Sequence, residues 1–361
     1  MSVVLTVDGD RWRAHLRETL AAEPELVPVV KGNGYGFGNG RLARRAQWLA
    51  DQGPGCDTVA VGTYPELADV EKRYDGDLVV LTPWRRFLDG AAEALASDRV
   101  IHTVGRTGDL ETMAATAAAG ARPRVVLERM TSMKRHGFTA RGLRTAAAEA
   151  KQAGVRLEGV SMHFPLDRSP GANLAELEAL MTDVVAAGLH REGLVVWVSH
   201  LRAADLSVIR QHHPEVRFRP RVGTALWLGD RGALHVTARV LDLHPVERGE
   251  SFGYRGRTAP RSGTIVVVSG GTAHGIGLEA PTGDTSLRSR ATSLARGGLD
   301  ALGAVRSPYV IGGKQRFFAE PPHMQASMLF LPAGADVPEI GDEVPLNVRY
   351  TATAFDRVSI T

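Results

Sequence analysis

Apolar and polar positions follow a regular rhythm through about the first two thirds of the chain. Short, valine-rich apolar runs with the length of buried parallel strands alternate with longer amphipathic or alanine-rich stretches that favour helix. The pattern predicts eight strands, at residues 26–31, 58–61, 77–81, 100–103, 124–128, 156–163, 194–199 and 216–221. It predicts helices at residues 10–22, 41–52, 65–74, 87–96, 110–119, 141–153, 174–187 and 203–210.

Eight strands with helices between them indicate an α/β fold, a closed (β/α)8 TIM barrel, rather than an open sheet. We expect this barrel to occupy residues 8–232. In such barrels the chemistry sits at the carboxyl ends of the strands. Polar side chains that close predicted strands are therefore candidates for a site, although each taken alone could equally be a capping group. They are Lys31, His163, Ser199, His200 and Arg221.

The rhythm changes after about residue 234. Runs rich in β-branched residues, separated by Gly, Pro and Ser turns, predict strands at residues 235–243, 263–270, 324–331 and 344–351. A mostly β second domain is therefore expected over residues 233–361. Inside it, residues 285–302 have a helical pattern with several arginines, and could form a lid or a surface insertion.

Composition narrows the class of protein without indicating a chemistry. The 361 residues carry a net charge of +3 on scattered basic side chains, which argues against nucleic-acid binding. The single cysteine, Cys56, excludes an intrachain disulfide framework, and no Cys/His spacing suggests a zinc site. The N-terminus lacks a signal-peptide pattern, and no apolar run approaches the ~20 residues of a membrane helix. We therefore expect a cytoplasmic protein with no nucleic-acid or membrane partner.

One lysine stands at the mouth of the first predicted strand. Residues 27–38 read Val-Pro-Val-Val-Lys-Gly-Asn-Gly-Tyr-Gly-Phe-Gly, so a buried strand ends at Lys31 and passes into a loop with glycine at every second position. A lysine in this place could be a solvated strand end, a phosphate binder, or an amine desolvated enough to form a Schiff base with an aldehyde. The residues alone leave these three interpretations open.

The octapeptide that begins at Lys31 resembles the Lys-Ala-Asn-Ala-Tyr-Gly-His-Gly motif of the alanine racemase family, which are fold type III pyridoxal-phosphate enzymes. The resemblance implies that Lys31 binds pyridoxal 5'-phosphate covalently and that Tyr35 contacts its phosphate. The glycines would let the backbone approach the cofactor closely. The resemblance also implies that an N-terminal strand, within residues 1–7, pairs with the C-terminal β domain.

A second segment resembles the same family. Residues 221–225, Arg-Val-Gly-Thr-Ala, are similar to its Arg-Phe-Gly-Ile-Ala segment. This implies that Arg221 bonds the pyridine nitrogen of the cofactor, and that Gly223 and Thr224 hold the phosphate. A guanidinium can only donate a hydrogen bond, so the pyridine nitrogen would stay unprotonated. A carbanion beside it would be reprotonated quickly, which suits racemisation more than decarboxylation or transamination.

Further resemblances complete the implied cofactor site. Residues 133–138, Met-Lys-Arg-His-Gly-Phe, resemble Met-Gly-Arg-Ile-Gly-Phe, so Arg135 would bond the phenolic oxygen of the cofactor and the substrate carboxylate. Glu128 stands where the family often carries a carbamylated lysine that orients this arginine, and a carboxylate could pair with the guanidinium in the same way. His163 matches a histidine that stacks on the pyridine ring, and Tyr350 matches a tyrosine that binds the phosphate.

The resemblance is weaker where the substrate would bind. The family carries a catalytic tyrosine, donated by the partner subunit, at the position that Thr272 occupies here, and threonine is a poor base. A histidine side chain can act as a base near neutral pH, so His274 is a candidate replacement, as is a water held by Thr272. In the loop that contacts the substrate carboxylate, Gln325 replaces an aspartate, which leaves the backbone amide of Met324 as the contact.

We therefore predict a pyridoxal-phosphate-dependent amino-acid racemase or epimerase, an isomerase that abstracts the α-proton of a substrate held as an aldimine. The replaced tyrosine keeps two alternatives open. One is a pyridoxal-phosphate enzyme of another reaction type, such as one-sided α-proton exchange, an aldolase or a lyase, and the other is a non-catalytic cofactor-binding protein. The resemblance further implies a head-to-tail homodimer in which the β domain of one chain completes the site of the other.

Overall fold

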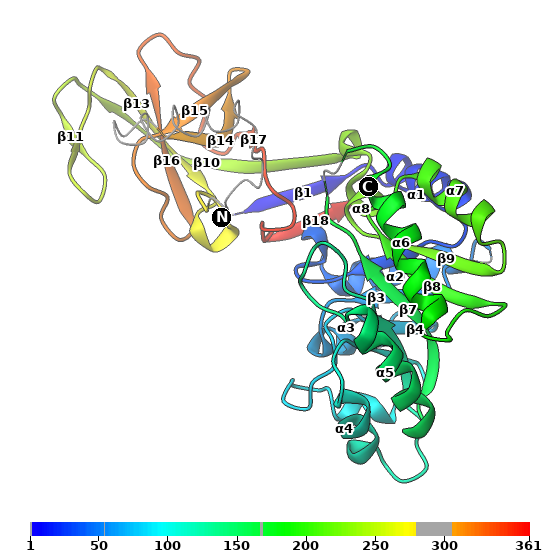
Figure 1. Ribbon diagram of the computed structural model, residues 1–361. Coiled ribbons are helices and arrows are strands. Elements are labelled where there is room, and N and C mark those ends of the chain that lie inside the picture. The colour runs from blue at the N-terminus through cyan, green and yellow to red at the C-terminus, as the bar shows by residue number, and fades with distance from the viewer. Residues whose placement is uncertain (1, 54, 167–168, 279–304) are drawn as a thin grey trace. The chain divides into compact units, whose positions relative to one another are not determined.

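The computed structural model describes residues 2–53, 55–166, 169–278 and 305–361 (Figure 1). These residues form two compact units: residues 14–229, which hold the barrel, and residues 1–13 with 230–361, which hold a second sheet. The helical pattern at residues 285–302 lies outside the described part of the chain. Among the described helices, none is long and apolar enough to cross a membrane.

Eight parallel strands close into a barrel, which confirms the predicted α/β barrel class. They follow one another in chain order, and the last pairs with the first to complete the ring. The strands are β2 (Val27–Val30), β3 (Thr58–Val61), β4 (Asp77–Val80), β5 (Val100–Val104), β6 (Arg124–Glu128), β7 (Arg156–His163), β8 (Leu194–Ser199) and β9 (Val216–Val222). Each begins and ends within one residue of the position that the apolar pattern predicts.

The barrel strands are valine-rich because both of their faces are covered. The register pairs Ala60 with both Val29 and Val79, so these three side chains share one face of the sheet. With Ile101 and Trp197 they belong to one buried hydrophobic cluster. This cluster fills the interior of the barrel and so holds the carboxyl ends of the strands in position.

Helices cover the outside of the barrel (Figure 1). They are α1 (Gly9–Ala22), α2 (Asn39–Ala50), α3 (Leu67–Glu71), α4 (Asp109–Thr116), α5 (Ala140–Gln152), α6 (Ala172–Ala186), α7 (Ala203–His212) and α8 (Thr224–Leu228). The helix predicted at residues 87–96 is wrong for most of its length, because only Glu93–Ala96 turns, as a 3-10 helix. The buried Trp84 donates its indole N–H to the Ala91 carbonyl at 3.0 Å, and Gly90 has φ 76°, so the segment folds back on itself.

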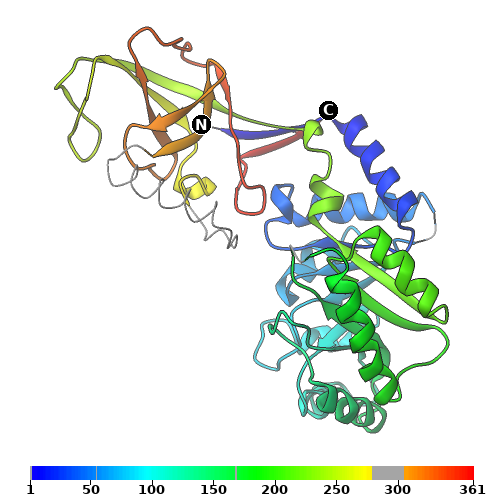
Figure 2. The same ribbon diagram turned by 45° about the horizontal axis from the view of Figure 1, so that its top comes forward.

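The second unit is built on one sheet, in the order β14-β15-β16-β13-β10-β1-β18, with β17 also paired to β10. Its strands are β1 (Val3–Val7), β10 (Leu234–Val246), β13 (Gly263–Ser269), β14 (Arg306–Ile311), β15 (Lys314–Phe318), β16 (Ala326–Pro332), β17 (Glu343–Pro345) and β18 (Arg357–Ile360). A separate hairpin joins β11 (Ser251–Phe252) to β12 (Arg257–Thr258). Figure 2 shows β1, in blue, between β10 and β18, to which it is hydrogen-bonded.

One strand prediction in this unit is wrong. The apolar pattern predicts a strand at residues 344–351, but β17 ends at Pro345. Beyond it the Asn347 N–H donates to the Pro308 carbonyl at 2.9 Å, and the chain turns where Ala352 N–H donates to the Arg349 carbonyl at 2.8 Å. Tertiary hydrogen bonds therefore replace the ladder that an extended segment would need.

Candidate active site

Lys31 follows β2 at the carboxyl end of the barrel strands, and the loop after it depends on glycine. Every glycine between residues 32 and 38 has a positive φ. A Cβ at Gly34 would lie 2.6 Å from the backbone nitrogen of Asn39. Tyr35 also has a positive φ, 53°, although it carries a side chain, and it is buried. A non-glycine residue held in this region is strained, and such strain clusters at functional loops.

The environment of Lys31 favours a neutral amine. Partial burial lowers the pKa of Lys31, the positive charges of Arg135 and Arg221 lower it further, and Glu66 acts in the opposite direction. A lowered pKa increases the neutral, nucleophilic fraction of an amine. Of the three interpretations that the sequence leaves open, this environment favours the Schiff-base amine over a solvated strand end.

Glu66 fastens the Lys31 loop to the neighbouring strand end, a role that sequence reasoning missed. Its Oε1 accepts from the Gly32 N–H at 2.8 Å, and its Oε2 accepts from the Gly62 N–H at 2.7 Å and the Thr63 N–H at 3.2 Å. One carboxylate thus joins the loops that follow β2 and β3. Glu66 lies five residues after the end of β3, and no motif or periodicity in the sequence singled it out.

Arg221 lies buried on β9, and one of its guanidinium nitrogens makes no hydrogen bond with the described residues. Its Nη1 donates to Ser161 Oγ at 2.8 Å, and its Nη2 donates to the Met162 carbonyl at 3.1 Å and to Ser199 Oγ at 3.2 Å. Its Nε is buried and has no hydrogen-bond partner among the described residues. Burial lowers the pKa of Arg221 to about 10, which leaves it protonated at neutral pH. A buried N–H without a partner is costly, so an acceptor is expected at this point.

Glu128 provides the nearby negative charge. It is 5% exposed at the end of β6, so its carboxylate does not face solvent. Burial raises the pKa of Glu128, while Arg221 and Arg135 lower it. Arg135 itself is exposed in the loop between β6 and α5. Glu128 and Arg135 therefore interact electrostatically, and no hydrogen bond joins them within the described part of the chain.

Two histidines face each other at the ends of β7 and β8. The rings of His163 and His200 meet edge to face, with centroids 4.9 Å apart, and His163 Nδ1 lies 2.7 Å from Ser199 Oγ. Burial, and then Arg221 and Arg135, lower the pKa of His163 to about 2, so the ring is neutral. The sequence placed both histidines at strand ends, but only His163 matched a family motif.

The hydrogen bonding and burial of His200 show which ring nitrogen carries its proton. It has φ 61°, and its Nδ1 lies 2.6 Å from the Phe164 carbonyl. A carbonyl can only accept, so Nδ1 carries the hydrogen and a neutral ring presents Nε2 as a proton acceptor. Burial lowers the pKa of His200, against the effect of the Phe164 hydrogen bond, which favours that neutral form.

The Tyr35 hydroxyl lies so close to Gly223 that residue 223 cannot carry a side chain without a clash. A Cβ at Gly223 would lie 2.0 Å from the Tyr35 Oη. Burial, and then Glu66, raise the pKa of Tyr35 to about 12, so its hydroxyl stays protonated and can donate. Thr224 follows at the start of α8 and is exposed. The structure thus brings Tyr35, Gly223 and Thr224 together with the lysine and arginine described above.

The remaining candidates lie in the second unit. Thr272 opens a 3-10 turn, and its N–H donates to the His323 carbonyl at 2.9 Å beside the exposed Met324. The Tyr350 ring has the Arg231 guanidinium 4.8 Å from its centroid, and burial raises the pKa of Tyr350 while Arg231 lowers it.

His274 sits in the same 3-10 turn as Thr272. Its Nδ1 accepts from the Gly271 N–H at 3.2 Å, and its Nε2 lies 3.3 Å from Asp356. Both ring nitrogens are therefore engaged within the second unit.

The chain is an α/β barrel whose carboxyl rim brings together a strained glycine loop, a lysine of lowered pKa and a buried arginine. A family model described as alanine racemase, N-terminal domain, matches residues 7–230. The chain therefore belongs to the alanine racemase family, which confirms the resemblance of its motifs.

Known proteins agree with this assignment. The chain is 28% identical over 270 residues to an alanine racemase of Nitratidesulfovibrio vulgaris (strain DSM 19637 / Miyazaki F), covering 69% of each chain. It is 28% identical over 287 residues to an alanine racemase of Mycobacterium tuberculosis, covering 71% of this chain and 68% of the relative.

Solved structures share the fold. The alanine racemase of Bartonella henselae, solved with covalently bound pyridoxal phosphate, superposes with a TM-score of 0.73 at 18% identity and covers 100% of both chains. That of E. faecalis gives a TM-score of 0.71 at 20% identity, covering 100% of this chain and 98% of the other.

Proposed function

We propose that the protein is a pyridoxal-phosphate-dependent amino-acid racemase or epimerase. The observation that carries this proposal is the presence, at one barrel mouth, of Lys31 with a lowered pKa and Arg221 with a buried, unpartnered Nε among the described residues. These groups fit the cofactor: an amine for its aldehyde and a buried N–H for its ring nitrogen. The Tyr35 hydroxyl beside Gly223 adds a donor for its phosphate.

The residues divide the chemistry among them. When bound, pyridoxal phosphate withdraws electrons from the substrate and makes the hydrogen on its Cα acidic. Lys31 Nζ accepts and returns that proton on one side, since its lowered pKa increases the neutral fraction. Arg221 would donate a hydrogen bond to the ring nitrogen of the cofactor without protonating it fully, and the neutral His163 would stack on the ring. Arg135, exposed at the mouth, binds the substrate carboxylate.

Racemisation needs a second proton carrier on the opposite side. His274, or a water held by Thr272, would serve if the second unit of a partner chain reaches the site. The engagement of both His274 nitrogens by Gly271 and Asp356 weighs against that residue. His200 is the alternative within the barrel, because its Nδ1 donates to Phe164 and its Nε2 is left to accept. The same engagement of His274 favours one-sided α-proton exchange as the second candidate function.

Proton exchange in heavy water tests the reaction. Each enantiomer of the common amino acids is incubated with the enzyme, and deuterium at Cα is measured by mass spectrometry together with chiral separation. A racemase incorporates deuterium into both enantiomers and forms the opposite one. Exchange into one enantiomer without inversion supports the second candidate, and no exchange with any amino acid contradicts both.

Two variants identify the second base. If His200 carries the proton, H200A abolishes inversion while exchange at the Lys31 side continues. If His274 carries it, H274A does so instead. Inversion that survives both substitutions assigns the role to a water or to another residue.

Cofactor attachment is tested separately. Borohydride reduction followed by peptide mapping should place the cofactor on the peptide that contains Lys31, and K31A should lose that modification. A chain that never binds the cofactor would contradict the proposed function as a whole.

Assembly and location form part of the same proposal. We infer a homodimer, because Thr272, Met324 and Tyr350 lie in the second unit and the family motifs imply that a partner completes the site. We also infer a cytoplasmic location and a small amino-acid substrate. The buried free thiol of Cys56, with a pKa raised to about 12 by burial, is compatible with a reducing compartment.

A further inference from the structure

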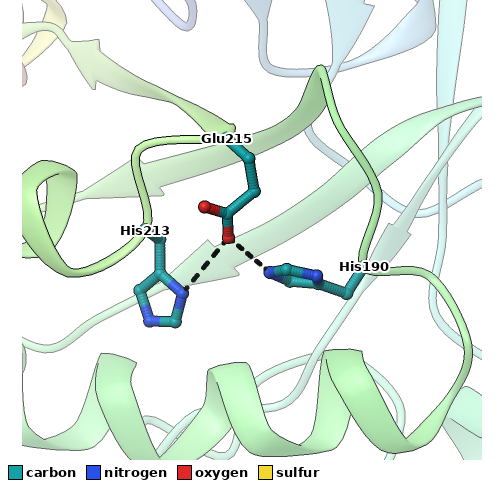
Figure 3. A group of neighbouring side chains, drawn as sticks. All are labelled: His190, His213 and Glu215. Carbon is teal, nitrogen blue, oxygen red and sulfur yellow. Dashed lines mark ion pairs between the residues drawn. The ribbon is translucent and has the colours of Figure 1, made fainter.

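Two histidines and a glutamate converge away from the Lys31 site. His190 Nε2 lies 2.6 Å from Glu215 Oε1, and His213 Nδ1 lies 3.8 Å from the same oxygen. Figure 3 shows the three side chains pointing toward one another from two loops. All of their ligand atoms lie within 4.8 Å of one another, so one ion could contact all three.

The backbone holds the two loops together. His190 lies in the loop between α6 and β8, while His213 follows α7 and Glu215 directly precedes β9. The Gly193 N–H donates to the Glu215 carbonyl at 2.9 Å, and the Val216 N–H donates to the His213 carbonyl at 3.0 Å. The positions of the three ligands are thus set by the register between two neighbouring barrel strands.

We propose that His190, His213 and Glu215 bind a divalent transition-metal ion, with Zn2+ as the first choice. Two imidazoles and one carboxylate are a ligand set that zinc prefers, and water completes the fourth position. The three side chains are 30%, 23% and 33% exposed, which gives an ion access from solvent and leaves room for that water.

The observed spacing is close to what the ion requires. Zinc bound tetrahedrally at about 2.0–2.1 Å holds its ligands about 3.4 Å apart. The two distances to Glu215 Oε1, 2.6 Å and 3.8 Å, lie on either side of this value. Small side-chain rotations therefore suffice.

The position separates the ion from the Lys31 site. All three residues precede β8 and β9, at the amino end of the barrel strands, whereas Lys31 follows β2 at the carboxyl end. Residues at the amino end of such barrels serve stability rather than catalysis. The ion would join two successive loops. The inference is independent of the proposed function, because it uses no residue of the candidate active site.

Zinc titration of the untagged full-length protein, first treated with EDTA, tests the site. Isothermal titration calorimetry with ZnCl2 measures the number of ions bound and their affinity. The expected result is one saturable high-affinity site per chain. Loss of an outer hydrogen-bond partner already weakens metal affinity by about 10- to 100-fold, so H190A or H213A should weaken it by at least about 100-fold. E215Q should also weaken it.

H212A is the matched control, since this histidine adjoins the site but pairs with Glu178 at 2.7 Å. Its zinc affinity should equal that of the wild type. Anomalous scattering at the zinc edge from wild-type crystals gives a second readout that does not depend on the folding of a variant, and should place zinc between the three side chains. No saturable binding, unchanged affinity in both H190A and H213A, or zinc only elsewhere would overturn the proposal.

Discussion

At the scale of single residues, the candidate site is governed by positive charge and close contact. Lys31, Arg135 and Arg221 surround one mouth, and the pKa of Lys31 falls partly because of the two guanidinium groups. Such a cluster is stabilised when an anion binds, and a phosphate or a carboxylate supplies one. Glu128, buried beside the arginines, offsets only part of this charge.

A substitution at the contact between Gly223 and Tyr35 tests whether these residues bind the phosphate of the cofactor. G223A adds a Cβ 2.0 Å from the Tyr35 Oη, which is a severe steric overlap. We expect the tyrosine to be displaced and the affinity for pyridoxal phosphate to fall by at least about 10-fold, or about 1.4 kcal/mol. Fluorescence titration of the apoenzyme measures it. Adding Y35F to G223A should recover part of the packing but not the hydroxyl contact, and unchanged affinity in G223A would refute the role.

Buried His102 gives the barrel a pH dependence. It is fully buried on β5, its Nδ1 meets the Tyr64 hydroxyl at 3.1 Å, and burial lowers its pKa from 6.5 to about 4. The unfolded chain therefore binds more protons between these values. The stability that neutral His102 contributes is complete above pH 6.5 and is lost as the pH falls toward 4, by about 3 kcal/mol in total.

The test of this dependence compares variants across pH. Melting temperatures between about pH 7 and about pH 4.5 should fall less steeply for H102Q than for the wild type, whatever their difference at neutral pH. H235Q, at an exposed histidine of β10, should keep the wild-type slope. Equal slopes for H102Q and the wild type would contradict the assignment.

At the scale of elements, hydrogen bonds from a side chain hold the loops that follow the barrel strands. Glu66 holds the loop that carries Lys31, because its carboxylate accepts hydrogen bonds from the Gly32 and Gly62 amides. A glutamine keeps one acceptor oxygen and replaces the other with a donor, which faces the N–H groups unfavourably. The residue acts through the loop and is a positioning residue.

E66Q should therefore loosen the Lys31 loop without unfolding the barrel. Hydrogen exchange by mass spectrometry should show faster exchange in the peptides containing Gly32 and Gly62, and kcat should fall by about 10-fold because the amine is less well placed. D69N, on the exposed face of α3, should leave both readouts unchanged. Protection factors in E66Q equal to those of the wild type would argue against the clamp.

At the scale of the whole molecule, the candidate residues are divided between two units. The barrel carries Lys31 and Arg221, and the second unit carries Thr272, Met324 and Tyr350. If a partner chain completes each site, light scattering should give twice the 38.7 kDa mass of one chain, and specific activity should fall on dilution as dimers dissociate. Full activity from particles of single-chain mass would exclude a shared site.

The sequence by itself determined the barrel strands to within a residue, since a strand buried on both faces must be apolar along its length and this is visible locally. It also located Lys31 and Arg221, because a polar residue that ends such a run reaches the carboxyl rim. Only the tertiary structure decided the broken helix at residues 87–96, the Glu66 clamp, the open Nε of Arg221 and the meeting of His190 with His213 and Glu215. These depend on contacts between segments far apart in the chain, which are fixed by strand register and packing and leave no periodic trace in the sequence.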